Sequence, residues 1–150
     1  GGTHSLVLSV GGEVYSFGSG DSGRLGHGSE KDQPVPKRIE AVGNVRALAA
    51  GEDHSMLLTE AGVVYSFGFG EEGRLGHGDD EDKLTPRAVE ALRSVRVSAV
   101  SAGCMTSLAV AAGGAAYGWG VGGEATLGLG LTDHQLTPLQ YPAAQLRVQV

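Results

Sequence analysis

The chain has 150 residues, which is the length of one ordinary domain with a buried core. Its net charge of −6 and pI of about 5.3 leave no basic footprint for a phosphate backbone, so we expect no direct nucleic-acid binding. The single cysteine, Cys104, excludes an internal disulfide. We find no basic leader and no apolar run of about 20 residues, so we expect no membrane span and an intracellular location, cytoplasmic or nuclear.

One segment type appears three times in the same order. Residues 1–28 read GGTHSLVLSVGGEVYSFGSGDSGRLGHG, residues 51–78 read GEDHSMLLTEAGVVYSFGFGEEGRLGHG, and residues 103–130 read GCMTSLAVAAGGAAYGWGVGGEATLGLG. A period near 50 residues, with glycines at matching points, is typical of propeller blades and other repeat arrays. We therefore divide the chain into one array of three repeats, at about 1–50, 51–102 and 103–150.

The middle repeat shows the expected elements best. Short apolar or alternating runs predict strands over 45–50, 54–59 and 63–67, and an outer strand around 87–89 follows Pro86. The segment 68–83 is expected to be a long loop, and no segment has helical periodicity. Four strands in each repeat predict an all-β fold, a β-propeller built of four-stranded blades with three blades present.

The repeats differ in length, and the first one starts after the position of its first expected strand. We equate Val95-Arg96 with Val45-Arg46, which places the two extra residues of the last step between 97 and 102. Residues 146–150, LRVQV, would supply the strand that is missing before Gly1. Two interpretations stay open: the chain is an arc of a larger ring, or copies of it self-associate through open blade edges.

The AG-x-x-HS of 50–55, the VYSFG of 64–68 and the GRLGHG of 73–78 resemble the repeat of the regulator of chromosome condensation family. The resemblance covers the whole chain and weakens in the third repeat, where Thr106 replaces the histidine and Trp119 replaces the phenylalanine. It implies a seven-bladed β-propeller. Family members include exchange factors for a Ran-type GTPase, a plant ultraviolet-B photoreceptor and propellers attached to ubiquitin ligases. The tryptophans of the photoreceptor branch are absent from the x-x positions here, so photoreception is not expected.

Some repeated residues are expected to be structural. Histidines that begin a buried strand commonly bond nearby backbone, whereas His27 and His77, which lie in glycine turns, are expected to be turn residues that tolerate solvent. Catalysis or metal binding is the alternative for the first pair. The structural positions that we assign are His4, His54, Gly23, Gly26, Gly28, Gly73, Gly76 and Gly78.

No catalytic, metal or cofactor motif stands out. The G-x-G-x-x-G of 18–23 opens no helix and carries a carboxylate where a pyrophosphate would need donors. The acidic run 79–82 lacks the alternation and central glycine of a calcium loop. Cys104 has no basic neighbour in sequence and is expected to be a buried, inert thiol. We expect no enzyme activity and no cofactor.

The x-x positions of G-x-x-H are the strongest candidates for partner contact, because loops on a rigid scaffold commonly carry binding. They lie in the turn between two inner strands, so successive copies should line up on one face. The candidate partner-binding residues are Thr3, Glu52, Asp53, Cys104 and Met105. Asp53 resembles an acidic residue of the exchange-factor branch. We therefore predict a non-catalytic scaffold that binds a protein partner, and the alternative is part of an exchange factor for a Ran-type GTPase.

Overall fold

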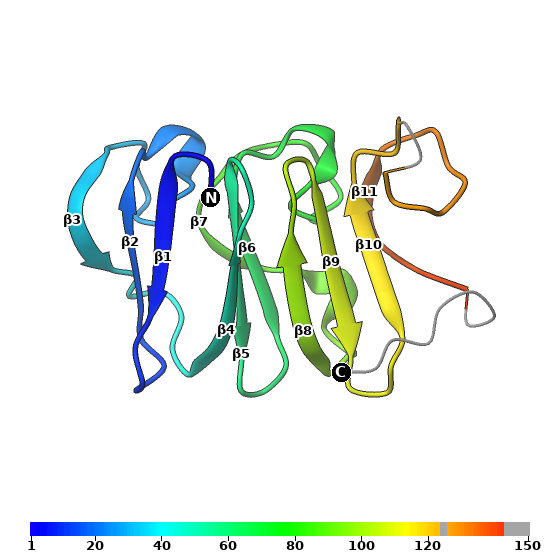
Figure 1. Ribbon diagram of the computed structural model, residues 1–150, viewed down its shortest axis with the longest axis horizontal. Coiled ribbons are helices and arrows are strands. Elements are labelled where there is room, and N and C mark those ends of the chain that lie inside the picture. Colours follow the sequence, from blue (N-terminus) through cyan, green and yellow to red (C-terminus); the bar gives the residue numbers. More distant parts are fainter. Residues whose placement is uncertain (124–125, 143–150) are drawn as a thin grey trace.

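The computed structural model describes residues 1–123 and 126–142, and these form three antiparallel sheets standing side by side in an arc (Figure 1). Blade 1 contains β1 (His4–Leu8), β2 (Val14–Gly18) and β3 (Gln33–Arg38). Blade 2 contains β4 (Val45–Ala50), β5 (His54–Thr59), β6 (Val64–Gly68) and β7 (Lys83–Ala88). Blade 3 contains β8 (Val97–Ala102), β9 (Thr106–Ala111), β10 (Ala116–Gly120) and β11 (Gln135–Gln140).

Helical structure in this part of the chain is limited to three 3-10 turns, η1 (Asp21–Gly23), η2 (Glu71–Gly73) and η3 (Glu90–Leu92). None of the helices found in the described residues has the length and hydropathy needed to cross a membrane. The all-β, four-stranded blade predicted from the repeat is confirmed in blades 2 and 3. In blade 1 three strands are described, and the strand predicted over 146–150 lies outside the described residues.

The hairpins β1–β2, β5–β6 and β9–β10 each close in a tight turn that contains a glycine with positive φ. In blade 2 the amide of Gly62 donates to the carbonyl of Thr59 at 2.9 Å, and Gly62 has a φ of 81°. An L side chain is strained at such a φ, which explains the glycine at the end of Glu60-Ala61-Gly62. The turn fixes the register in which Leu58 faces Val64.

The outer strand begins earlier than predicted. β7 runs from Lys83 to Ala88 and includes Pro86, whereas the sequence suggested a strand around 87–89. This strand pairs with β6 alone and is therefore an edge, where a proline costs no ladder hydrogen bond. The register slips between Ser66 and Gly68, so the pairing resumes at Lys83 after a bulge.

The predicted place of the two extra residues is wrong. Val97, and not Val95, is the equivalent of Val45: the amides of Val45 and Val97 bond to the carbonyls of Gly12 and Gly62, both at 3.1 Å. The additional residues therefore lie between Leu92 and Val97, in the connection that follows η3. The prediction had matched the VR pair at 95–96 with the VR pair at 45–46. The equivalent positions are instead the two buried valines, Val45 and Val97.

The core lies between the blades, not within them. On one side of β5, Leu57 joins Val14 and Phe67 in a cluster shared with blade 1. On the other side, Met56 and Leu58 join Trp119 and other residues shared with blade 3. All the side chains of β5 are buried, and burial of each large apolar side chain stabilises the fold by about 2 kcal/mol. The middle blade is thus held by both neighbours.

Candidate protein-interaction face

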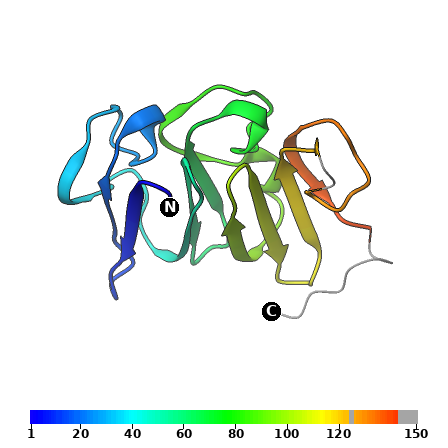
Figure 2. The same ribbon diagram turned by 45° about the horizontal axis from the view of Figure 1, so that its top comes forward.

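The loops gather on two opposite faces of the arc (Figure 2). The upper face contains the x-x turns at 3, 52–53 and 104–105 and the long loops 19–32, 69–82 and 121–134, with 124–125 not described. The lower face contains the hairpin turns 9–13, 60–63 and 112–115 and the connections 39–44 and 89–96. All five residues predicted to contact a partner therefore lie on the upper face.

Main-chain hydrogen bonds connect the three x-x turns. The amide of Gly2 donates to the carbonyl of Glu52 at 3.1 Å, and the amide of Glu52 donates to the carbonyl of Gly103 at 3.3 Å. A groove of about 470 Å³ runs across these turns, and its lining includes Gly51, Glu52 and Cys104. The turns therefore form one continuous rim whose spacing is set by backbone contacts.

Arg24 joins Thr3 and Asp53 at the junction between blades 1 and 2. Its guanidinium lies 2.6 Å from the carboxylate of Asp53, donates to the hydroxyl of Thr3 at 2.7 Å, and donates to the carbonyl of Asp21 at 2.9 Å. The side chain of Arg24 is 9% exposed and that of Asp53 is 30% exposed. Asp53 thus has a structural partner in addition to its position on the predicted binding face.

The junction between blades 2 and 3 also contains a buried arginine, Arg74, but its partners differ from those of Arg24. Met105 stands where Asp53 stands one repeat earlier, so the buried Arg74 lacks that carboxylate. Arg74 instead lies over the Phe69 ring at 4.8 Å and donates to the carbonyl of Cys104 at 3.2 Å. Its nearest ion-pair partner is Glu72 at 3.7 Å. An aromatic face, a carbonyl and a more distant carboxylate here stabilise the guanidinium in place of the close carboxylate of Asp53.

Cys104 is exposed, which corrects the prediction of a buried thiol. It lies in a surface turn, and its thiol is hydrogen-bonded to the carboxylate of Glu52. This hydrogen bond and the nearby negative charge raise the pKa of the thiol above its usual value. The expected inertness is therefore supported by electrostatics, not by burial.

His4 and His54 connect neighbouring blades, whereas the sequence suggested bonds to nearby backbone. The Nε2 of His4 lies 2.9 Å from the hydroxyl of Ser55, and the Nε2 of His54 lies 2.8 Å from that of Ser107. Ser55 donates its hydroxyl proton to the carbonyl of Arg24 at 2.8 Å. The imidazole Nε2 must therefore donate to the serine.

This donor pattern excludes these histidines as bases toward the serines to which they are bonded. Their Nδ1 atoms have no hydrogen-bond partner. Burial lowers the pKa of His4 to about 4 and that of His54 to about 3, and neighbouring positive charges add to the effect. Both rings are therefore neutral at pH 7. Each forms a hydrogen bond across a blade junction.

The segments 23–28 and 73–78, which we term the glycine loops, pack each blade on the next. The amide of Gly28 donates to the carbonyl of Leu84 at 2.9 Å, and Gly26 lies against the ring of Phe67. The second loop repeats these contacts: Gly78 bonds to Leu136, Gly76 lies against Trp119 and Gly73 lies against Leu136, as Gly23 lies against Leu84.

The loop histidines, predicted as turn residues that tolerate solvent, also bond to a neighbouring strand. The Nε2 of His27 lies 2.8 Å from the hydroxyl of Ser16, and His77 forms the same contact with Ser66 at 2.9 Å. Both rings are half-buried, and desolvation lowers their pKa values. They connect the glycine loop to the strand beneath it.

Within the described residues, no group of three or more His, Cys, Asp or Glu side chains converges as a metal site would require. Two acidic residues of the run 79–82 form contacts within blade 2. Asp82 accepts from the amide of Gly70 at 2.8 Å, and Asp79 pairs with Lys83 at 2.9 Å. Asp79 and Asp82 thus make local contacts within the long loop of blade 2.

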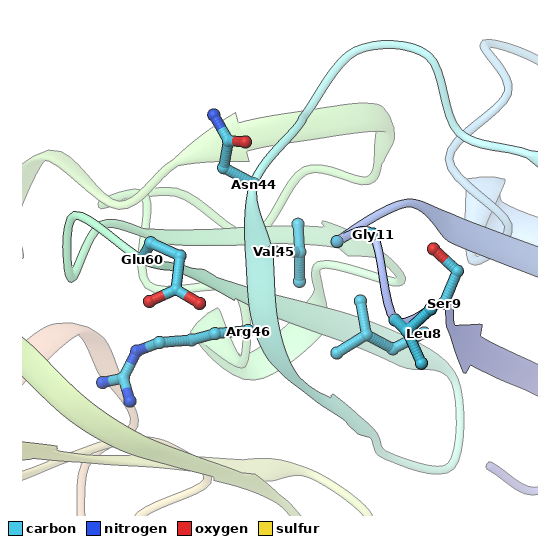
Figure 3. Close-up of a pocket in the computed structure, with 9 residues that line it drawn as sticks. Leu8, Ser9, Gly11, Asn44, Val45, Arg46 and Glu60 are labelled. Carbon is cyan, nitrogen blue, oxygen red and sulfur yellow. The ribbon is translucent and has the colours of Figure 1, made fainter.

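A second pocket, of about 390 Å³, lies on the lower face between the β1–β2 turn and β4 (Figure 3). Asn44, Arg46 and Glu60 line it beside Leu8 and Ser9. Arg46 is already engaged, since it donates to the carbonyls of Val97 at 3.0 Å and Ser98 at 2.8 Å. None of the predicted partner-binding residues lies here.

Sequence reasoning missed Arg24 and Arg74, although both occupy the same place in GRLGHG. The signal that could have found them is the match between the Arg24 and Asp53 charges across a repeat boundary. A single repeat does not contain both residues, so a search within repeats cannot reveal the pair.

The chain matches the model of the regulator of chromosome condensation (RCC1) repeat over residues 11–58 and 61–110. It is 42% identical over 149 residues to the human E3 ubiquitin-protein ligase HERC2, a match that covers 97% of this chain and 3% of the ligase. It is 41% identical over 141 residues to the ultraviolet-B receptor UVR8 of Arabidopsis thaliana, covering 92% of this chain and 32% of the receptor.

Solved structures give the same result. Human WBSCR16 superposes with a TM-score of 0.87 at 29% identity, covering 99% of this chain and 39% of that one. Prp20p from Saccharomyces cerevisiae superposes with a TM-score of 0.84 at 28% identity, covering 95% of this chain and 37% of Prp20p. This chain spans well under half the length of each of these relatives. It is an arc of RCC1-type propeller blades, and it belongs to the RCC1 repeat family.

Proposed function

We propose that this chain is a non-catalytic interaction module that binds a basic protein surface through its upper face. The supporting observation is a segregation of charge between the two faces. The upper loops and turns carry the acidic residues Asp21, Glu30, Asp32, Glu52, Asp53, Glu71, Glu72, Asp79, Asp80, Glu81, Asp82 and Asp133. Their basic residues are Lys31, Lys83, which pairs with Asp79, and the buried Arg24 and Arg74.

The lower side has the opposite balance. The acidic residues at or near its turns are Glu13, Glu40, Glu60 and Glu90, and the basic residues are Lys37, Arg38, Arg46, Arg87, Arg93 and Arg96. A surface with one dominant sign speeds encounter with a partner of the opposite sign and opposes partners of the same sign. The upper face therefore suits a partner surface rich in lysine or arginine.

One structural relative supplies two probes. The Prp20p structure concerns its binding to Gsp1p and histones. We would measure binding of both proteins to this chain, with Glu52→Lys as the upper-face variant and Glu60→Lys as the lower-face control. Both glutamates are exposed, so neither change should unfold the chain. We expect about tenfold weaker binding for Glu52→Lys and little change for Glu60→Lys. Equal effects of the two variants would contradict the proposal.

An exchange-factor role is the second candidate, supported by the structural likeness to Prp20p and by the position of Asp53 on the upper face. Release of labelled nucleotide from a Ran-type GTPase separates the two functions. Faster release in the presence of the chain favours exchange, whereas binding with unchanged release favours the interaction module. A cytoplasmic or nuclear location stays a prediction.

A further inference from the structure

The lower face contains an apolar pocket at the junction between blades 1 and 2. Its volume is about 520 Å³, and its lining comes from the connection before β4, from the β5–β6 turn and from Tyr65 of β6. We propose that this pocket binds one aliphatic side chain of a partner protein, and that a lysine or arginine stands next to that side chain in the partner. The site lies on the face opposite to the acidic surface and does not depend on the upper-face function.

The pocket lies inside the array of blades. Every residue that lines it lies between 43 and 65, in the part of the chain that has a described blade on each side. Tyr65 packs against the apolar cluster that blades 1 and 2 share. A Cβ on Gly43 would meet no atom within 4 Å. The open space therefore belongs to a junction whose two blades are both present.

The next junction has a valine at the position of Gly43. Val45 and Val97 are equivalent because their amides form the same hydrogen bond, so Gly43 corresponds to Val95. The residue that follows the valine is Arg96. The chain itself thus offers a valine and an arginine at one junction where it has a bare glycine at the other.

This valine belongs to the apolar packing of its junction. Val95 is half-buried, and it packs together with Tyr117 against the cluster that blades 2 and 3 share. Tyr117 is the equivalent of Tyr65. Removal of an aliphatic side chain from water is favourable, and the glycine junction lacks this contribution. The space beside Tyr65 therefore suits an aliphatic side chain supplied by another protein.

The charge at the pocket indicates what stands beside that side chain. Glu60 lines the pocket, is exposed, and forms no ion pair with any residue that the structure describes. Arg46, which lies near it in Figure 3, donates to two carbonyls of blade 3. A single lysine or arginine complements the carboxylate of Glu60. The lower side as a whole carries more basic than acidic residues, which limits the complement to one cation.

The test uses a tetrapeptide as the probe. Acetylated and amidated Arg-Ser-Val-Arg has the sequence of residues 93–96 and carries a valine next to an arginine. We would titrate it into the isotope-labelled 150-residue chain and follow the backbone amides by NMR. We expect saturable shifts of the Gly43 and Ala61 signals. A peptide with serine in place of the valine should bind at least about tenfold more weakly, because it buries no aliphatic group.

Two glycines of the lower face give a matched pair of variants. Gly43→Val should fill the pocket from within and weaken binding of the valine peptide by at least about tenfold. Gly113→Val adds a valine to the lower-face turn of blade 3 and should bind like the unmodified chain. Neither glycine has a positive φ, and a Cβ on either would meet nothing within 4 Å, so both variants should fold. Glu60→Gln should weaken binding by about threefold.

Three results would overturn the proposal. The first is an absence of saturable shifts at Gly43 and Ala61, and the second is equal binding by Gly43→Val and the unmodified chain. The third is equal binding of the valine and serine peptides, which would reduce the contact to charge attraction. A second copy of the chain as the occupant would show as a mass that rises with concentration without peptide and that Gly43→Val abolishes, and it would exclude a separate partner.

Discussion

At the scale of single residues, the Arg24–Asp53 ion pair shows how a buried charge is stabilised at a blade junction. Asp53→Ala would leave a guanidinium that is only 9% exposed without its carboxylate at 2.6 Å. Asp53 is partly exposed, so we expect a loss of about 2 kcal/mol in the free energy of unfolding, between surface and buried values. Urea denaturation would measure it. Asp80→Ala, an exposed site in the same acidic face, should change stability by less than about 0.5 kcal/mol. An equal loss for both would show that the pair does not stabilise the junction.

At the scale of elements, two glycines of the first glycine loop allow the cost of backbone strain to be measured separately from the cost of a steric clash. Gly26 and Gly28 both have a φ of 76°, so alanine at either position should cost about 1 kcal/mol of stability. A Cβ on Gly26 would also collide with the ring of Phe67, whereas a Cβ on Gly28 would meet only Thr85 at 3.6 Å. We expect Gly26→Ala to cost about 2 kcal/mol more than Gly28→Ala in thermal or urea unfolding. Similar losses would mean that the Phe67 contact relaxes freely.

At the scale of the whole molecule, periodic sequence predicts blades better than it predicts their junctions. The apolar run in 54–59 and the glycine at 62 are local, so they identify a strand and its turn without any neighbour. The bond between His54 and Ser107 and the exposure of Cys104 depend on the next blade, which no single repeat contains. The site was therefore predictable as a row of turns, while its internal contacts were not.

The same junctions determine how the stability of the molecule depends on pH. His54 is completely buried, and its pKa falls from 6.5 in the unfolded chain to about 3 in the fold. Below pH 6.5 the unfolded state binds a proton that the folded state does not, so stability falls as the pH falls toward 3. Between pH 6.5 and 5 the loss from this one group is about 2 kcal/mol, and His4, whose pKa falls to about 4, adds to it.

His54→Gln should remove this contribution while its amide can still donate to Ser107. We expect the variant to be less stable than the unmodified chain at pH 7, with a smaller loss of unfolding free energy between pH 7 and 5, measured by urea denaturation at each pH. His134→Gln is the control, because His134 is exposed and its imidazole lies outside the blade junctions. If His54→Gln retained the full pH dependence, the buried imidazole of His54 would not be its source.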